Sequence, residues 1–183
     1  MKKFIYLGII LLLGYFFINS IYQELNRDKT PGKAKRIECQ KELTTFEKAF
    51  DIQEIHFLQK FIESGNIKIS SDIEKSVHSK STLFEYISLE ETDLLFNREL
   101  SLYQKNSILQ KDDYKLYYYI YENDKNDPGK TNKKSKNYAG YVVLEVKNDK
   151  NRIIYKVQID FMNEKGLDIH KSIHCIIKSL MTF

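Results

Sequence analysis

The sequence predicts an α+β protein, with an N-terminal transmembrane helix followed by helices packed on a three- to four-stranded antiparallel β-meander and a C-terminal helix. Three observations lead to this prediction. An uncharged apolar stretch runs from Phe4 to Tyr22, three β-branched and aromatic runs stand close together in the last third of the chain, and amphipathic patterns flank them. With 183 residues, the chain is long enough for one folded domain with a core.

The N-terminal apolar stretch has the length of a membrane span. Its nineteen residues would extend about 28 Å as a helix, close to the roughly 30 Å hydrocarbon core of a bilayer. A cleaved signal peptide is the alternative, but the small residues of a cleavage site do not follow. We therefore expect residues 1–26 to be a signal anchor that crosses the cytoplasmic (inner) membrane once and contacts the bilayer through residues 4–22.

The charges near this stretch leave its orientation open. Seven Lys and Arg residues against Glu24 and Asp28 give residues 1–36 a net charge of +5, so residues 37–183 carry about −1. A count of these basic residues favours a cytoplasmic domain. A short basic start before an apolar stretch is, however, typical of export signals, so we expect a periplasmic domain. Because its own charge is not basic, we expect no nucleic-acid partner.

A basic linker, residues 27–36, separates this stretch from a single α+β domain, residues 37–183. Apolar residues recur every three to five positions from Ile37 to Glu63, which predicts an amphipathic helix with a break near Asp51. Two pairs with capping-box spacing then predict short helices, namely Ser71 with Glu74 and Ser88 with Glu91. Between these pairs, STLFEYIS fits a strand or a helical turn. The segment ELSLYQKNSIL, 99–109, is ambiguous and fits an extra edge strand.

The last third of the chain predicts three strands and a helix. The strands are the runs YKLYYYIYE, YAGYVVLEVK and RIIYKVQIDFM, which polar turn-forming segments separate. Pairing Leu116 with Leu144, and Val146 with Ile153, gives one continuous apolar face. The helix IHKSIHCIIKSLM follows, with Asp168 suited to its N-cap, and its apolar stripe is the natural cover of that face.

The opposite face of the same strands carries four tyrosines, which we call the tyrosine face: Tyr117, Tyr119, Tyr121 and Tyr141. Two interpretations are open. The helices of residues 40–63 and 71–103 cover this face, or it is exposed and binds a partner, a role that suits the amphipathic tyrosine ring. The lysine-rich segment 123–137 between the first two strands is interpreted as a solvated hairpin loop.

Cys39 and Cys175 lie far apart and match no metal-binding spacing. Cys175 falls outside the apolar stripe of the last helix, so a role beyond core filling is indicated. In an oxidising compartment the two cysteines can form a disulfide, whereas a cytoplasmic domain would favour two free thiols.

Residue types that carry catalysis occur without a catalytic pattern. His170 and His174 have the i, i+4 spacing of two metal ligands, but no third ligand accompanies them, so we expect no metal. Glu90, Glu91 and Asp93 fit the start of a helix, where acids interact with the macrodipole. No nucleophile motif and no glycine-rich phosphate loop is present, so neither an enzyme nor a cofactor is expected.

These observations predict a membrane-anchored, non-enzymatic, extracytoplasmic interaction protein of the bacterial-type cell envelope. It would be a component of an envelope complex or a toxin-neutralising, immunity-type protein, with a protein partner in or at the membrane. The alternative is an envelope enzyme or small-ligand-binding protein with a pocket between helices and sheet. A third interpretation places the anchored domain in the cytoplasm.

Overall fold

The computed structural model describes residues 14–15, 36–65, 67–105, 114–132 and 137–183. The chain divides into two compact units, Met1–Ala34 and Lys35–Phe183, and each is considered by itself. In the first unit only Gly14 and Tyr15 are described, and both are helical. The second unit is the folded domain.

The prediction of an N-terminal transmembrane helix needs correction. Within the described ranges, no helix has the length and apolar character needed to span a membrane. The predicted span, Phe4 to Tyr22, lies outside those ranges apart from Gly14 and Tyr15. The fold that the structure describes is therefore α+β without a transmembrane helix.

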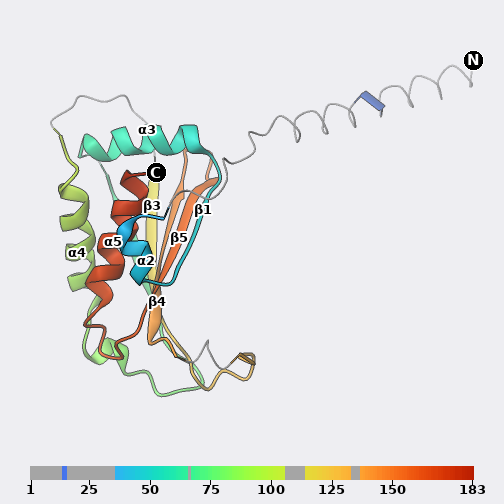
Figure 1. Ribbon diagram of the computed structural model, residues 1–183, viewed down its shortest axis with the longest axis vertical. Helices are drawn as coiled ribbons and strands as arrows, with labels where there is room; N and C mark the ends of the chain where they lie inside the picture. The colour runs from blue at the N-terminus through green and yellow to red at the C-terminus, as the bar shows by residue number, and fades with distance from the viewer. Residues whose placement is uncertain (1–13, 16–35, 66, 106–113, 133–136) are drawn as a thin grey trace, which may run out of the picture. The chain divides into compact units, whose positions relative to one another are not determined.

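The described part of the domain contains four α-helices, a short 3₁₀ helix and five strands (Figure 1). In chain order these elements are α2 (Glu38–Glu42), β1 (Thr45–Ala49), α3 (Ile52–Glu63), β2 (Ile69–Glu74), η1 (Leu83–Glu85), α4 (Leu89–Ser101), β3 (Lys115–Glu122), β4 (Gly140–Lys147), β5 (Ile153–Phe161) and α5 (Ile169–Met181).

The five strands form one mixed sheet in the order β1-β5-β4-β3-β2. The three strands of the last third, β3, β4 and β5, are successive antiparallel neighbours. β1 pairs antiparallel with β5, whereas β2 pairs parallel with β3. The prediction of a three- to four-stranded antiparallel meander is therefore wrong, because the front half of the chain supplies both edge strands.

The edge strand β1 lies within a segment that the sequence predicts to be one amphipathic helix. The segment Ile37 to Glu63 is α2, β1 and α3 rather than one amphipathic helix. In β1 the side chains alternate between solvent and interior, and Phe46 is 60% exposed, so the local period is two. The break expected near Asp51 is where α3 begins, because the Asp51 carboxylate accepts the Glu54 N–H at 3.0 Å.

The two capping-box spacings have different outcomes. Ser88 and Glu91 cap the start of α4 reciprocally, with both hydrogen bonds at 3.2 Å, as predicted. Ser71 instead lies in β2, where part-buried and exposed residues alternate, so the predicted helix there is wrong. STLFEYIS contains the helical turn η1. In the segment 99–109, the residues up to Ser101 end α4, so no strand begins there, and 106–109 lie outside the description.

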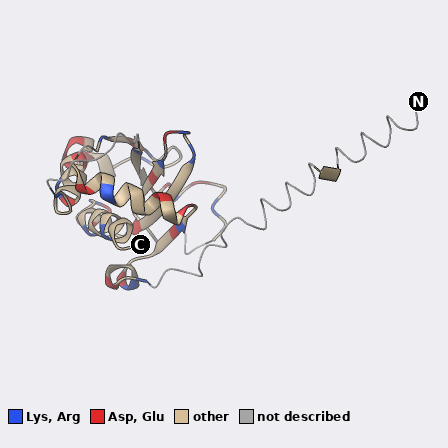
Figure 2. Ribbon diagram, turned by 90° about the horizontal axis from the view of Figure 1, so that it is seen from above, with Lys and Arg blue, Asp and Glu red and all other residues tan. Residues whose placement is uncertain are grey.

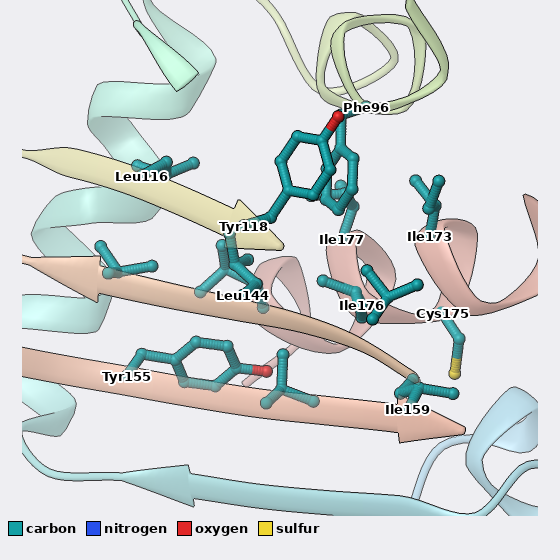
Figure 3. Close-up of a cluster of buried hydrophobic side chains, with 14 of the residues drawn as sticks. Phe96, Leu116, Tyr118, Leu144, Tyr155, Ile159, Ile173, Cys175, Ile176 and Ile177 are labelled. Carbon is teal, nitrogen blue, oxygen red and sulfur yellow. The ribbon is translucent and has the colours of Figure 1, made fainter. Parts of the chain in front are cut away.

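The hydrophobic core lies between one face of the sheet and the helices (Figure 3). Tyr118 and Tyr155 project from the strands into this core, and both are fully buried. The ring of Tyr118 stacks on Phe96 of α4 with centroids 3.9 Å apart. Its hydroxyl donates to the Asp93 carboxylate at 2.6 Å and lies 3.1 Å from the Thr92 hydroxyl, so its polar atom is satisfied where the ring is buried.

The strand register differs from the predicted one by two residues. Leu116 pairs with Val146 rather than Leu144, and Val146 pairs with Tyr155 rather than Ile153. A bulge near Val146 leaves Ile154 without a partner on β4, and its carbonyl accepts the Phe50 N–H instead. Because side chains alternate with period two, the shift preserves the faces over most of the sheet. At the bulge the prediction is wrong, because Ile154 belongs to the core cluster in place of Ile153.

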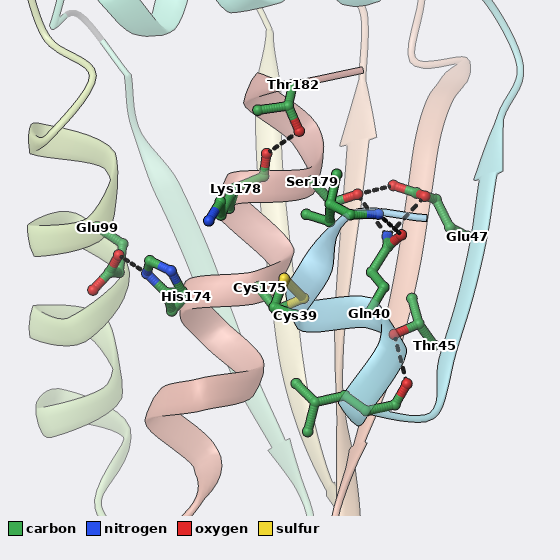
Figure 4. The surroundings of a disulfide bond; sticks show 12 residues. Cys39, Gln40, Thr45, Glu47, Glu99, His174, Cys175, Lys178, Ser179 and Thr182 are labelled. Carbon is green, nitrogen blue, oxygen red and sulfur yellow. Dashed lines mark hydrogen bonds and ion pairs between the residues drawn. A yellow bond between two sulfur atoms is a disulfide. The ribbon is translucent and has the colours of Figure 1, made fainter. Parts of the chain in front are cut away.

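A disulfide joins α2 to α5, between Cys39 and Cys175 (Figure 4). The predicted pairing is therefore present, and no described cysteine is free. Beside it, the Glu47 carboxylate of β1 accepts hydrogen bonds from Tyr155, Ser179 and Gln40. This network and the disulfide fix the N-terminal part of the domain to its last helix.

The side chain of Asp168 does not cap α5, although the residue stands at the N-cap position. Its carboxylate accepts the backbone N–H groups of Met162, at 2.8 Å, and Asn163. Asp168 therefore closes the connection between β5 and α5 rather than satisfying the first turn of the helix, which corrects its predicted role.

Candidate binding surface

The tyrosine face lies on the side of the sheet opposite the helices. Alternation along β3 sends Leu116, Tyr118 and Ile120 to the core, so the tyrosines between them project the other way. Of the described elements, α3, α4 and α5 all pack on the core side. The four tyrosines are half-buried and do not belong to the residues packed on the core cluster. The interpretation in which those helices cover this face therefore does not describe the fold.

The four rings form a continuous chain of aromatic contacts. Tyr121 and Tyr141 stack with centroids 4.5 Å apart, and Tyr141 meets Tyr119 edge-on at 6.4 Å. Tyr119 in turn lies 6.0 Å from Tyr117. Rings in such arrangements support one another, which restricts their rotamers before any partner arrives.

Val143 shows how tightly the rings cover the strands beneath them. It pairs with Tyr119 on the tyrosine side of β4, and its exposed fraction is 0%, yet it does not belong to the core cluster. Its burial therefore arises on the outer side of the sheet. The tyrosine face is a packed aromatic layer with a small apolar base of its own.

The registers of the five strands place the surrounding charges in rows across the sheet. The row through Tyr121 and Tyr141 ends in Glu74 on β2 and Asp160 on β5. The next row places Asp72 beside Tyr119. The tyrosines on β3 and β4 thus have carboxylates beside them on both neighbouring strands, β2 and β5.

In the row through Tyr117, the charge of the acid is balanced by lysines of the same sheet. Glu145 lies beside Tyr117 and binds Lys156 at 2.6 Å and, more loosely, Lys147 at 4.0 Å. At the end of the two strands, Lys115 lies opposite Lys147. The acid in this row is neutralised within the sheet.

Burial and neighbouring charge keep the tyrosine hydroxyls protonated. Burial raises the pKa of Tyr117, and the nearby Asp72 raises it further. Burial likewise raises the pKa of Tyr119, against the opposing effect of Lys156. Burial and the phenol of Tyr119 raise the pKa of Tyr141 well above its ordinary value. These hydroxyls are therefore hydrogen-bond donors throughout the neutral range.

Asp160 is a buried acid at the border of the tyrosine face, with 6% of its surface exposed. One carboxylate oxygen accepts the Gln158 side-chain N–H at 2.9 Å. Burial raises the pKa of Asp160, because the charged form loses hydration there.

Lys130, from the loop between β3 and β4, reaches back to the tyrosine face. Its ammonium lies 5.3 Å from the centroid of the Tyr121 ring and 3.4 Å from the hydroxyl. It also donates to the side chain of Asn123 and, at 3.0 Å, to the carbonyl of Asp124. This part of the loop, interpreted from the sequence as solvated, is held against an aromatic ring.

Two acids beside this loop organise the turn that follows β2. Glu122 accepts the backbone N–H groups of Thr82, at 2.7 Å, and Leu83, at 2.8 Å. Asp124 accepts the N–H groups of Val77 and His78. Burial opposes ionisation of Asp124, but these hydrogen bonds outweigh it and lower its pKa to about 2. The pKa of Glu122 is lowered in the same way, against the effect of burial. Both carboxylates therefore serve the fold.

The two candidate metal ligands, His170 and His174, form hydrogen bonds with different partners. The Nδ1 atom of His170 lies 2.9 Å from the Leu167 carbonyl, whereas that of His174 lies 2.8 Å from Glu99. Within the residues that the structure describes, no group of three or more histidines, cysteines and acids is arranged to hold a metal ion.

A cavity of about 450 Å³ lies between α4 and the start of α5. Apolar residues dominate its lining, and the polar ones are Glu91, Thr92, Arg98 and His170. Glu91 and His170 also make the local hydrogen bonds described above. This cavity has no lining residue from the sheet, so it is not the pocket between helices and sheet that the alternative function requires.

Fold and surface together define a disulfide-bonded α+β domain whose sheet carries helices on one face and an aromatic layer on the other. No family model, no curated protein and no solved structure matches the chain. Lys and Arg are interspersed with Asp and Glu along the ribbon of the domain (Figure 2). The candidate site therefore rests on its own geometry.

Sequence reasoning assigned the four tyrosines to one face but missed two contributors. Glu74 joins the face only because β2 is a strand, and the capping-box spacing at Ser71 concealed that. Lys130 comes from a loop whose composition gives no sign of a fixed position. The alternation in ISSDIE, residues 69–74, was the available signal for Glu74.

Proposed function

We propose that this chain is a non-enzymatic, extracytoplasmic interaction protein of the cell envelope that binds a protein partner through its tyrosine face. The observation that carries the proposal is the four-ring aromatic layer on the sheet face away from the helices. The partner would be a member of an envelope complex or a toxic enzyme that the domain neutralises.

Tyrosine is well suited to such a contact, because it buries a large ring at a low cost in conformational entropy and keeps a hydroxyl for hydrogen bonding. Here the rings already support one another, so little ordering remains for the binding step. The raised pKa values keep their hydroxyls as donors.

The four tyrosines alone are too small for a stable interface. They extend over about 13 Å of strand and two strands, whereas a standard interface buries about 800 Å² on each partner. The same sheet face continues across β5 to β1, where Phe46 is 60% exposed. We assign the tyrosines to the centre of the interface and Phe46 to its rim.

Two features of the chain support a proposal for its compartment. A disulfide between Cys39 and Cys175 supports an oxidising location, because such bonds persist outside the cytoplasm. The apolar sequence from Phe4 to Tyr22 supports export and association with the cytoplasmic membrane. We therefore propose a periplasmic domain at the surface of that membrane.

Co-purification from native membranes tests the proposal. A tagged chain with Tyr117→Ser and Tyr119→Ser should lose a partner that the unchanged chain retains, while its circular dichroism spectrum stays the same. The control is Tyr86→Ser, since Tyr86 is 53% exposed and lies outside the tyrosine face. The recovered protein is then identified by mass spectrometry and its binding repeated with purified components.

A partner retained equally by all three chains would overturn the tyrosine face as its binding surface. Conversion of a substrate by the purified chain, unaffected by the tyrosine substitutions, would instead favour the enzyme alternative.

A further inference from the structure

We propose that the tyrosine face receives an arginine-bearing segment of the partner, whose guanidinium lies on the Tyr141 side of the Tyr121–Tyr141 stack, in the row between Glu74 and Asp160. The inference rests on the proposed function and specifies the chemistry of the partner.

The strand registers align two acids with the stacked rings. Glu74, Tyr121, Tyr141 and Asp160 are consecutive residues across β2, β3, β4 and β5. Neighbouring strands lie about 4.8 Å apart, so the two acids stand roughly 14 Å apart at the ends of the row. The stacked rings fill the space between them. An extended side chain lying along this row would meet aromatic surface in the middle and a carboxylate at either end.

The acids around these two rings lack a balancing cation among the described residues. In the described part of the chain, Asp72, Glu74 and Asp160 form no ion pair, whereas Glu145 binds two lysines. Asp160 is also largely buried, and a buried carboxylate is costly unless a cation or several hydrogen bonds compensate it. The sheet thus neutralises the acid beside Tyr117 and leaves those around Tyr121 and Tyr141 for a cation from outside.

One cation of the chain already lies on this aromatic layer. The ammonium of Lys130 is within cation–π distance of the Tyr121 ring, 5.3 Å from its centroid. The fold itself therefore places a cation against the electron-rich surface of one of these rings. Lys130 approaches from the loop end of β3, which leaves Tyr141 and Asp160 for the partner.

Arginine fits this row better than lysine. Its planar guanidinium stacks on aromatic rings and forms paired hydrogen bonds with a carboxylate, whereas an ammonium acts as a compact point charge. A planar cation can stack on a ring and at the same time direct two N–H groups at one adjacent carboxylate.

The test uses the full chain in a non-ionic detergent and three synthetic peptides that alternate glycine with arginine, lysine or glutamate. Calorimetric titration should give binding in the order arginine, lysine, glutamate, and added salt should weaken it. Glu74→Gln and Asp160→Asn should each weaken binding of the arginine peptide by about fivefold. The control Glu90→Gln removes an exposed acid of α4 and should leave binding unchanged.

Equal affinity of the arginine peptide for the unchanged chain and for Glu74→Gln would overturn the inference. Glu74 is exposed, so this variant is expected to fold even if Asp160→Asn does not.

The outcomes also distinguish failure of the arginine inference from failure of the proposed interaction function. If the co-purified partner depends on Tyr117 and Tyr119 but binds Glu74→Gln normally, the arginine inference fails while the interaction function stands. If capture does not depend on the tyrosines, the function itself fails.

Discussion

Tyr121 and Tyr141 stack across β3 and β4 with their ring centroids 4.5 Å apart and an interplanar angle of 18°. Their strands are joined by a connection of seventeen residues, 123–139, so the contact arises from strand pairing rather than from a tight turn. The pair lies on the sheet face away from the core, where stacking supports ring order and none of the described helices packs. This relationship underlies both proposals.

Tyr117 and Tyr118 are adjacent in sequence and should respond in opposite ways to the same substitution. Tyr118→Ser empties a fully buried site beside Phe96 and should cost about 3–5 kcal/mol of unfolding free energy. Tyr117→Ser removes only contacts within the tyrosine face and should cost about 0.5–1.5 kcal/mol. Urea denaturation followed by circular dichroism measures both values. Equal costs would contradict the assignment of the two residues to different faces.

Removal of the disulfide should weaken the domain strongly. Cys39 and Cys175 are 136 residues apart in sequence, so the bond restricts most of the unfolded chain. Replacing both by serine should lower the unfolding free energy by about 2–5 kcal/mol. Denaturation with and without reductant provides the measurement, and the double variant is its own control because reductant should no longer affect it. A double variant as stable as the oxidised chain would contradict this role.

Low pH should protonate Asp124 and weaken its hydrogen bonds to the turn that follows β2. Its pKa is about 2 in the folded chain and near 3.8 when unperturbed, so the unfolded state binds the proton more readily. The stability that its ionised form contributes is complete above about pH 4 and is lost as the pH falls through 2. Glu122, whose pKa is also lowered, acts in the same direction.

Amide chemical shifts of Val77 and His78, which donate to Asp124, report this transition. We expect them to titrate with a midpoint near pH 2. In Asp124→Asn the same signals should lack that step. A midpoint near 4 in the unchanged chain would show that these hydrogen bonds do not stabilise the carboxylate.

Gly140→Ala should disrupt the start of β4. An added Cβ would lie 2.2 Å from the Tyr121 carbonyl oxygen and 2.5 Å from the Phe161 ring, so backbone and core would both have to shift. The expected cost is about 1–3 kcal/mol, measured as the change in unfolding free energy. Gly129→Ala is the control, since its closest neighbour is the side chain of Asp127 at 3.1 Å in an exposed turn. Equal effects at both positions would contradict the close approach at Gly140.

The sequence predicts the last third of the fold well because its strands have long, consistent patterns. Alternation assigned Leu116 and Tyr117 to opposite faces, and this survived a two-residue error in register because the period is two. The register itself differs in both strand pairs, and no residue type in these segments marks it or the bulge that leaves Ile154 unpaired on β4.

The front half could not be predicted as well, because short edge strands carry weak signals. Phe46 and Phe50 fit a helical spacing in the sequence, yet in the structure both are exposed and Glu47 between them points inward to Tyr155. Tertiary pairing with β5 decides this segment, not its local pattern. The parallel pairing of β2 with β3 likewise requires knowledge of the whole sheet.

The candidate site likewise contains residues that the sequence predicts and residues that only the pairing of strands reveals. Its tyrosines follow from alternation within β3 and β4, whereas the acids at the ends of the row depend on which strands become neighbours. The burial of Asp160 and its place beside Tyr141 depend on the pairing of β4 with β5, which the sequence alone does not reveal.

Photocrosslinking at position 119 tests the central claim most directly. A photoreactive phenylalanine analogue replaces Tyr119 in cells that produce the chain naturally, and position 86 serves as the matched exposed control. We predict a crosslink to one defined protein from position 119 and none from position 86, with the crosslink reduced by Glu74→Gln. No protein adduct at 119, or the same adducts at both positions, would contradict a binding role for the tyrosine face.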